Sequence, residues 1–154
     1  MLIRNIKEFL KLTIDKKLIS LDLGKKKIGI AISDSKHIIT TPLTVVDKKE
    51  LFKKLLKIII EYSLGGILIG IPLNPSKKNS NSEQMVKDMT ENINNFLVKN
   101  NYELPIFFWD ESYTSLEAEE LTEKFFKNTK KQKKQIDKFA AKIILDDFLR
   151  ENKK

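Results

Sequence analysis

The sequence lacks cysteine altogether, and it has one histidine and one tryptophan among its 154 residues. Without cysteine the chain can form no disulfide, no thiolate zinc site and no cysteine nucleophile. Any bound metal ion must therefore be held by oxygen ligands. The absence of disulfides is typical of the reducing cytoplasm, where we expect the protein to be located.

Long hydrophobic runs are also missing. No apolar stretch approaches the roughly 20 residues that a transmembrane helix needs. Charges at Arg4, Lys7, Glu8 and Lys11 interrupt the first segment, which therefore does not have the pattern of a secretory signal. We expect a soluble protein with no membrane partner.

The length of the chain predicts one domain, because 154 residues can bury one core but not two substantial ones. We assign this domain to residues 18–154. Residues 1–17 then form an N-terminal extension, whose pattern is compatible with an amphipathic helix.

Positive charge is in excess, with a formal net charge of +8 and a pI near 9.5. A basic surface attracts phosphate backbones, so nucleic acid is the leading candidate for a partner. The basic residues are nearly all lysine, since Arg4 and Arg150 are the only arginines. A genome rich in A and T would produce the same composition, so the charge leaves both explanations open. The shortage of arginine argues against recognition by paired guanidinium contacts.

Hydrophobic periodicity predicts strands at residues 18–23, 28–33, 38–46, 67–71 and 106–109. The predicted helices occupy residues 48–62, 81–98, 114–126 and 136–149. Capping boxes that begin at Ser80 and Thr114 mark the starts of the helices at 81–98 and 114–126. Gly65-Gly66 is expected to end the helix at 48–62. A loop of lysines is expected before the last helix.

The order of these elements predicts an α/β fold with a five-stranded mixed sheet flanked by helices. Short turns join the first three strands, which should be antiparallel. Helical crossovers lead to the fourth and fifth strands, which should run parallel to the first.

Acidic residues follow two of the predicted parallel strands. Asp22 lies at the end of the first strand, and Asp110 and Glu111 directly follow the fifth. Open α/β sheets bind ligands at the carboxyl ends of their strands, so these acids are candidates for one site. Each also has a simpler explanation, as a turn aspartate near Gly24 or as an acidic linker before a helix N-terminus.

A fourth acid, Asp137, extends the apolar side of the last helix. Asp137, Ala141, Ile144 and Phe148 fall along one side of that helix, which should face the sheet. A carboxylate that faces a sheet needs a partner. The helix dipole would also favour an aspartate in a first turn, so Asp137 alone does not define a site.

Clustered carboxylates repel one another, so a stable cluster implies bound cations, and hard oxygen ligands favour Mg²⁺ or Mn²⁺. Two such ions about 3.5–4 Å apart can activate the attacking water and stabilise the departing oxygen of a phosphodiester. No histidine base is needed, and we expect His37, the only histidine, in a surface turn. The sequence therefore predicts a metal-dependent nuclease with Asp22, Asp110, Glu111 and Asp137 as catalytic and metal-binding residues.

Polar residues near this edge are candidates for contacts with nucleic acid. The loop at 72–81 introduces a helix whose free N–H groups could hold a phosphate. The lysine run before the last helix could follow a nucleic-acid backbone, or it could be a flexible solvated loop. The candidates are Lys25, Lys77, Lys78, Thr114, Lys130, Lys131, Lys133 and Lys134. Few exposed aromatic residues are expected, which favours recognition by shape and backbone over recognition of base sequence.

Several short motifs occur in the order in which a known protein family has them. The matching segments are Leu21-Asp22-Leu23-Gly24, residues 28–34, Thr41-Pro42-Leu43, Gly70-Ile71-Pro72-Leu73-Asn74, Asp110-Glu111-Ser112-Tyr113-Thr114-Ser115, Glu117-Ala118, Ile136-Asp137, Ala140-Ala141 and Ile144-Leu145. They cover nearly everything after Leu18, and as an ordered set they are specific. The chain resembles the YqgF or RuvX family, described as Holliday junction resolvases and as pre-16S rRNA nucleases.

The resemblance implies a ribonuclease H-like fold and a cytoplasmic hydrolase that trims the ribosomal RNA precursor. It implies structured RNA rather than DNA as the partner, ribosomal precursor particles among the partners, and a monomer or homodimer. It also implies that Asp22, the acid pair and Asp137 are the catalytic positions. The chain has Ser112 and Lys25 where the family usually has arginine and threonine.

Other functions remain open from the sequence. The Asp-Leu-Gly motif also occurs in ATP-handling proteins of the actin and sugar-kinase type, but those need two such domains to enclose a nucleotide. A Holliday junction resolvase-like DNA nuclease would use the same carboxylates. A non-catalytic nucleic-acid-binding module could use the lysines alone, although it would not need acids at all three sites.

Overall fold

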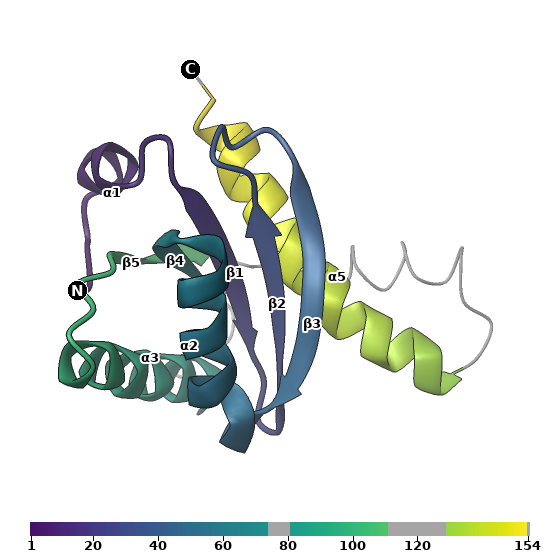
Figure 1. The fold of residues 1–154 in the computed structure, drawn as a ribbon. Helices are drawn as coiled ribbons and strands as arrows, with labels where there is room; N and C mark the ends of the chain where they lie inside the picture. The colour runs from purple at the N-terminus through teal and green to yellow at the C-terminus, as the bar shows by residue number, and fades with distance from the viewer. Residues whose placement is uncertain (74–80, 111–128, 154) are drawn as a thin grey trace.

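The computed structural model describes residues 1–73, 81–110 and 129–153, with side chains for residues 1–73, 82–110 and 139–153. Within these residues, five strands form one sheet in the order β3-β2-β1-β4-β5 (Figure 1). β1 is antiparallel to β2 and β2 to β3, whereas β1, β4 and β5 are parallel. The predicted mixed sheet is confirmed. Its strands are β1 (Lys17–Leu23), β2 (Lys27–Ser33), β3 (Thr40–Asp47), β4 (Leu64–Ile71) and β5 (Ile106–Asp110).

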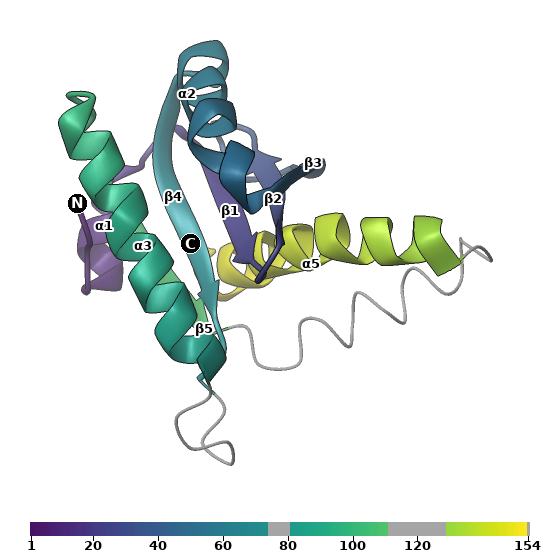
Figure 2. The ribbon, with the colours of Figure 1, turned by 90° about the horizontal axis from the view of Figure 1, so that it is seen from below.

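Helices cover both faces of the sheet (Figures 1 and 2). α2 and α3 pack on one face, and α1 and α5 pack on the other. No helix in the described residues is both long and apolar enough to cross a membrane. The described helices are α1 (Ile6–Leu12), the short 3₁₀ helix η1 (Lys48–Glu50), α2 (Leu51–Tyr62), α3 (Asn81–Lys99) and α5 (Thr129–Glu151).

Each face of the sheet has its own hydrophobic core, because successive side chains of a strand point to opposite faces. In β1, Ile19 and Leu21 pack against α2 and α3, whereas Leu18 packs with Phe148 of α5. A sheet buried on both faces needs nearly continuous apolar strands, which is why the strands were recognisable as apolar runs.

The segment between α2 and β4 differs from the prediction. Gly65 and Gly66 were expected to end the helix, but they lie inside β4. The helix ends instead at Ser63, whose backbone adopts a left-handed φ of 50°. The prediction was wrong because a serine can adopt the conformation that more often requires glycine at a helix end.

The two glycines of β4 allow the chain that leads into β1 to pass very close. A Cβ atom on Gly65 would lie 2.2 Å from the Cβ atom of Lys16. One on Gly66 would lie 2.6 Å from Cγ2 of Thr13. Both distances are shorter than a van der Waals contact, so β4 can take its place in the sheet only without side chains here.

α5 begins at Thr129 rather than at residue 136. The lysine run at 130–134 therefore lies on a helical backbone and not in a loop. The prediction was wrong because a charged run was taken for a loop, although lysine and glutamine are good helix formers. Asp137 consequently lies inside α5 and not in its first turn, so the helix dipole does not account for it. The predicted helix at 114–126 and its cap, and the cap at Ser80, lie outside the described residues.

The turn between β2 and β3 is longer than predicted, since β3 begins at Thr40 rather than at residue 38. Asp34 closes this turn by accepting hydrogen bonds from the N–H groups of Ile38 at 2.7 Å and Ile39 at 2.9 Å. Desolvation alone would raise the pKa of Asp34, but these backbone donors outweigh it and hold that pKa below its usual value. The two isoleucines are exposed, so their apolar character misled the assignment.

The N-terminal segment packs on the α5 side of the sheet. Leu2 forms a parallel bridge with Ile106 of β5. The helix in this segment is limited to Ile6–Leu12, and its Phe9 is fully buried. The Phe9 ring meets the ring of Phe148 edge to face at 5.8 Å.

Replacing Gly66 with alanine should lower the free energy of unfolding by about 1–3 kcal/mol, because overpacked groups must shift to accommodate a new methyl group. That methyl would overlap Thr13 and Leu18. Urea denaturation measures the change, and the exposed α2 substitution Lys57→Ala is a control that should change stability by less than about 0.5 kcal/mol. Unchanged stability of Gly66→Ala would contradict the close approach of β4 to the segment before β1.

Candidate active site

Asp22 lies near the end of β1 on the face of the sheet that α5 covers. By strand alternation it shares that face with Leu18, which packs in the α5-side core, and with Ser20. The intervening residues Ile19 and Leu21 belong to the opposite core. Asp22 is half-buried. Its carboxylate therefore stands where the apolar α5 interface meets the carboxyl edge of the sheet.

Glycines flank Asp22 on both neighbouring strands. Asp22 pairs with Gly29 of β2. On the other side, Leu21 pairs with Ile69 of β4, so the next residue, Asp22, lies beside Gly70. The two neighbouring strands, each about 4.8 Å away, therefore contribute no Cβ atom beside this carboxylate.

A buried hydrogen bond joins α5 to β1 beside this position. The Ser20 hydroxyl donates to the backbone carbonyl oxygen of Ala141 at 2.5 Å. Both residues are fully buried. Since a buried hydroxyl needs a partner, this bond fixes how far α5 can slide along β1.

α5 runs against the direction of β1, so its earlier turns approach the carboxyl end of that strand (Figure 1). At the other end, Leu149 and Asn152 line a pocket together with Asp15, which precedes β1. Asp137 lies one helical turn before Ala141 on the same side of α5. The backbone of α5 thus carries Asp137 toward the edge at which Asp22 lies, although the Asp137 side chain is outside the described residues.

Two further contacts hold α5 across the sheet. The indole N–H of Trp109 in β5 donates to Oδ2 of Asp147 at 2.8 Å. At β3, the Thr40 hydroxyl donates to Asp146, which also accepts from the Lys142 ammonium at 2.6 Å. α5 is therefore bonded to β1, β3 and β5, and its tilt over the sheet is set at three points.

β5 presents its residues alternately to the two faces. Trp109 packs in the α5-side core, whereas Phe108 packs against the α2–α3 core. Alternation puts Asp110, the exposed last residue of β5, on the α2–α3 side and not on the face of Asp22. Glu111 lies outside the described residues.

The structure describes only part of the predicted nucleic-acid surface. Lys25 is exposed in the turn that follows β1. Lys77, Lys78 and Thr114 lie outside the described residues. The lysines at 130–134 are placed by their backbone in α5, and their side chains are not described.

His37 lies at the opposite end of the sheet from Asp22. Its Nε2 atom is 2.7 Å from the backbone carbonyl oxygen of Lys16, so the ring is bonded to the segment that enters β1. His37 also has a left-handed φ of 58°. The prediction that it lies in a turn between strands is confirmed.

Sequence reasoning did not identify Ser20, Gly29 or Gly70 as parts of this site. Their signals were present but weak. Ser20 is a polar residue two positions before Asp22 in an otherwise apolar strand, which places both on one face. The glycines could be connected with Asp22 only once the strand register was known.

The described part of the site fits a hard cation. Asp22 offers carboxylate oxygens, which Mg²⁺ and Mn²⁺ prefer, in a position where neighbouring strands carry glycine. Among the described residues, no group of three or more acidic, histidine or cysteine side chains could hold a metal ion. Two of the four predicted ligands, Glu111 and Asp137, have side chains outside those residues.

The fold is similar to that of a protein whose structure was solved with a Holliday junction. A solved structure described as T. thermophilus RuvC in complex with Holliday junction substrate superimposes with a TM-score of 0.55. The match covers 89% of this chain and 96% of that one, at 10% sequence identity. This similarity confirms the predicted ribonuclease H-like fold.

Curated relatives match over most of the chain. Two of them, from Pelagibacter ubique and Thermoanaerobacter pseudethanolicus, are each 36% identical, and the matches cover 86% of this chain and 89% and 95% of theirs. A third, from Rickettsia canadensis, is 33% identical over 97% of this chain and 96% of its own. All three carry the name "Putative pre-16S rRNA nuclease".

The family match covers nearly the whole chain. Residues 16–151 match a family described as RuvX: Holliday junction resolvase. The matched range begins just before β1 and ends with α5, so it contains the sheet, α5 and all four predicted carboxylates. Together with the identities of its relatives, this match shows that the chain belongs to the RuvX family.

Proposed function

We propose that this protein is a metal-dependent nuclease that hydrolyses phosphodiesters and processes the 5′ end of pre-16S rRNA during ribosome biogenesis. The observation that carries the proposal is the Ser20–Ala141 hydrogen bond, which holds α5, the helix that contains Asp137, against β1, the strand that contains Asp22 near its carboxyl end. The names of the curated relatives support the choice of reaction and substrate.

The residues that would hold the metal are Asp22, Asp137 and either Asp110 or Glu111. Mg²⁺, with Mn²⁺ as a substitute, suits such an all-oxygen set. When bound, it would supply an activated water and stabilise the departing oxygen of a phosphodiester.

The chain itself contributes rigid positions for these acids. Asp22 is held in a central strand of the sheet, and the three bonds of α5 limit the movement of Asp137 relative to it. Sites on strands and helices position ligands more accurately than sites on loops. The exposed Lys25, two residues beyond Leu23, would attract the phosphate backbone toward the same edge.

We propose Glu111, rather than Asp110, as the third ligand. Residues two apart in a strand share a face, so Asp110 lies on the same face as Phe108, opposite to the face of Asp22. A ligand for a metal shared with Asp22 must approach from the α5 face. If the alternation of β5 continued by one residue, the next position would be on that face.

Structured RNA is the proposed substrate, with ribosomal precursor particles as its natural form and the cytoplasm as the location. The protein would act as a monomer or homodimer, with residues 18–154 as the nuclease domain. A second candidate is a DNA nuclease that resolves four-way junctions, favoured by the fold similarity to a junction-bound protein. A non-catalytic nucleic-acid-binding module is the alternative if no cleavage occurs.

Asp22→Asn and Asp137→Asn should each strongly reduce Mg²⁺-dependent cleavage, because each removes a direct ligand. The loss should exceed the factor of about 10–100 that is typical when a residue behind a ligand is changed. Both variants should also lose the rise in melting temperature that Mg²⁺ gives by binding the folded state. Cleavage of labelled precursor RNA and thermal melting with and without Mg²⁺ measure the two effects.

The matched control is Asp15→Asn, which removes the same charge at the far end of the sheet, where Asp15 pairs with Lys36. It should leave both readouts unchanged. Wild-type cleavage by the Asp22→Asn variant would overturn the assignment of the carboxylate site.

Glu111→Gln should abolish cleavage, whereas Asp110→Asn should retain at least about a tenth of it, since loss of a neighbouring charge costs less than loss of a ligand. Initial rates at saturating Mg²⁺ compare the two. The reverse order of effects would show that Asp110, and not Glu111, is the ligand.

A precursor rRNA fragment should be cleaved faster than a four-way DNA junction when both are incubated with Mg²⁺ under single-turnover conditions. Binding to either should weaken steeply with salt, because each lysine contact to a phosphate releases a counterion. Faster cleavage of the junction would favour the DNA nuclease instead. Binding without cleavage of either would favour the non-catalytic alternative.

A further inference from the structure

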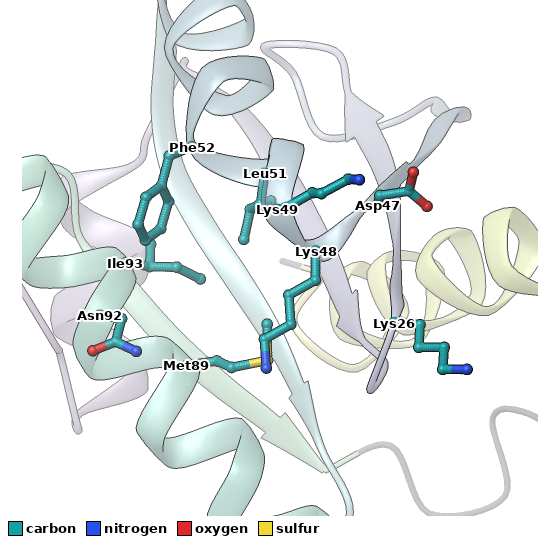
Figure 3. A pocket seen from close by; sticks show the side chains of 9 residues that line it. All are labelled: Lys26, Asp47, Lys48, Lys49, Leu51, Phe52, Met89, Asn92 and Ile93. Atoms are coloured by element: carbon teal, nitrogen blue, oxygen red, sulfur yellow. The ribbon is translucent and has the colours of Figure 1, made fainter.

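A groove of about 670 Å³ lies between the start of α2 and α3, on the face of the sheet opposite α5 (Figure 3). Part of its lining is apolar, since Leu51, Met89 and Ile93 are buried residues of the α2–α3 core. The other lining residues are Phe52 and five polar residues, three of which are lysines. These polar residues are Lys26, Asp47, Lys48, Lys49 and Asn92.

Phe52 provides an aromatic surface in this groove and is 37% exposed. Its ring stacks on that of Phe96, with centroids 4.4 Å apart and planes 8° from parallel. This contact fixes the orientation of the Phe52 ring. A ring held in this way offers a flat surface on which any nucleobase can stack. The expectation of few exposed aromatic residues overlooked it, because the helical pattern of residues 48–62 did not mark position 52 as apolar.

The charge of the groove favours an anion. Three lysines line the groove, and the carboxylate of Asp47 is the one acidic group among its lining residues. In Figure 3, the Lys48 side chain extends from η1 toward Met89 of α3, while Lys26 lies at the other side of the opening and its side chain extends away from Lys48.

The groove is continuous with the carboxylate edge. The turn after β1 carries Lys25 at its exposed tip and Lys26 at the groove, shortly after Asp22. The N–H of Lys48 donates to the backbone carbonyl oxygen of Lys26 at 2.8 Å, which joins this turn to η1. A nucleic-acid strand that crosses the edge at Lys25 therefore passes from the face of Asp22 into the groove.

We propose that this groove binds a single-stranded segment of the nucleic-acid substrate, with a base stacked on Phe52 and phosphates held by Lys26 and Lys48; the proposal rests on the nuclease function proposed above. A second copy of the chain is a poorer occupant, because both copies carry a net charge of +8. An acidic peptide would satisfy the lysines but has no base to place on the ring.

The test measures fluorescence anisotropy of labelled single strands of about ten nucleotides, within the usual site size of such grooves. Oligouridylate, oligothymidylate and an abasic strand of equal length are each titrated with the full chain in EDTA. The wild type should bind at least one base-carrying strand about 5- to 10-fold more tightly than the abasic strand. The two base-carrying arms separate RNA from DNA as the source of the base.

Phe52→Leu should remove the preference for bases while keeping an apolar side chain on Phe96, and Phe52→Trp should retain it. Lys48→Gln should lower the slope of log affinity against log salt by about 0.7, the value for one phosphate contact on a single strand. The matched control is Lys57→Gln, in α2 but outside the groove. It should leave base preference and salt slope unchanged.

Equal affinity of the wild type for abasic and base-carrying strands would overturn the proposal. The proposal would also be overturned if polyglutamate bound as tightly as the base-carrying strands, competed with them and required Phe52. The assay contains no metal, so binding is measured without cleavage. Base preference without any cleavage would leave the groove proposal standing while the nuclease proposal fails, and cleavage without base preference would do the opposite.

Discussion

The arrangement of the candidate site depends on the buried hydroxyl of Ser20. This group has no access to water, so leaving it without a partner would cost about 1–3 kcal/mol. Its acceptor is the carbonyl oxygen of Ala141, and a shift of α5 by one residue would break that bond. The distance from Ala141 back to Asp137 is set by the helix itself. One hydrogen bond thus fixes the helical segment that contains Asp137 along the strand that contains Asp22.

The carboxyl edge of the sheet separates two kinds of surface. On the α5 face, Asp22 stands beside Gly29 of β2, which carries no Cβ atom. On the α2–α3 face, lysines surround an apolar groove with one stacked aromatic ring. The lysines of the groove suit a polyanionic ligand.

Much of the fold could be predicted because its strands are buried on both faces and read as apolar runs. The parallel direction of β4 and β5 followed from the helical crossovers before them. The roles of Gly65 and Gly66 could not be predicted, since they depend on Lys16 and Thr13 packing close by. The early start of α5 was missed because the charged residues at 130–134 were taken as a sign of a loop, although their helix propensity is high.

The candidate site was predictable to a similar degree. Asp22 stood out as an acid in an apolar strand, and its place at the carboxyl edge is confirmed. The face toward which Asp110 points was not predictable, because strand parity depends on which residues of β5 enter each core. Phe52 was missed for a related reason, as its exposure is decided by the neighbouring α3 and not by α2.

The alternation along β5 makes the spacing of this strand unusually strict. Trp109 must face α5 to reach Asp147, and the residue after it must then face away. Deleting or inserting a single residue between Ile106 and Trp109 would turn the indole to the wrong side and exchange the directions of everything that follows. We therefore expect homologous chains to vary in loop length on either side of β5 while keeping the length of the strand itself constant.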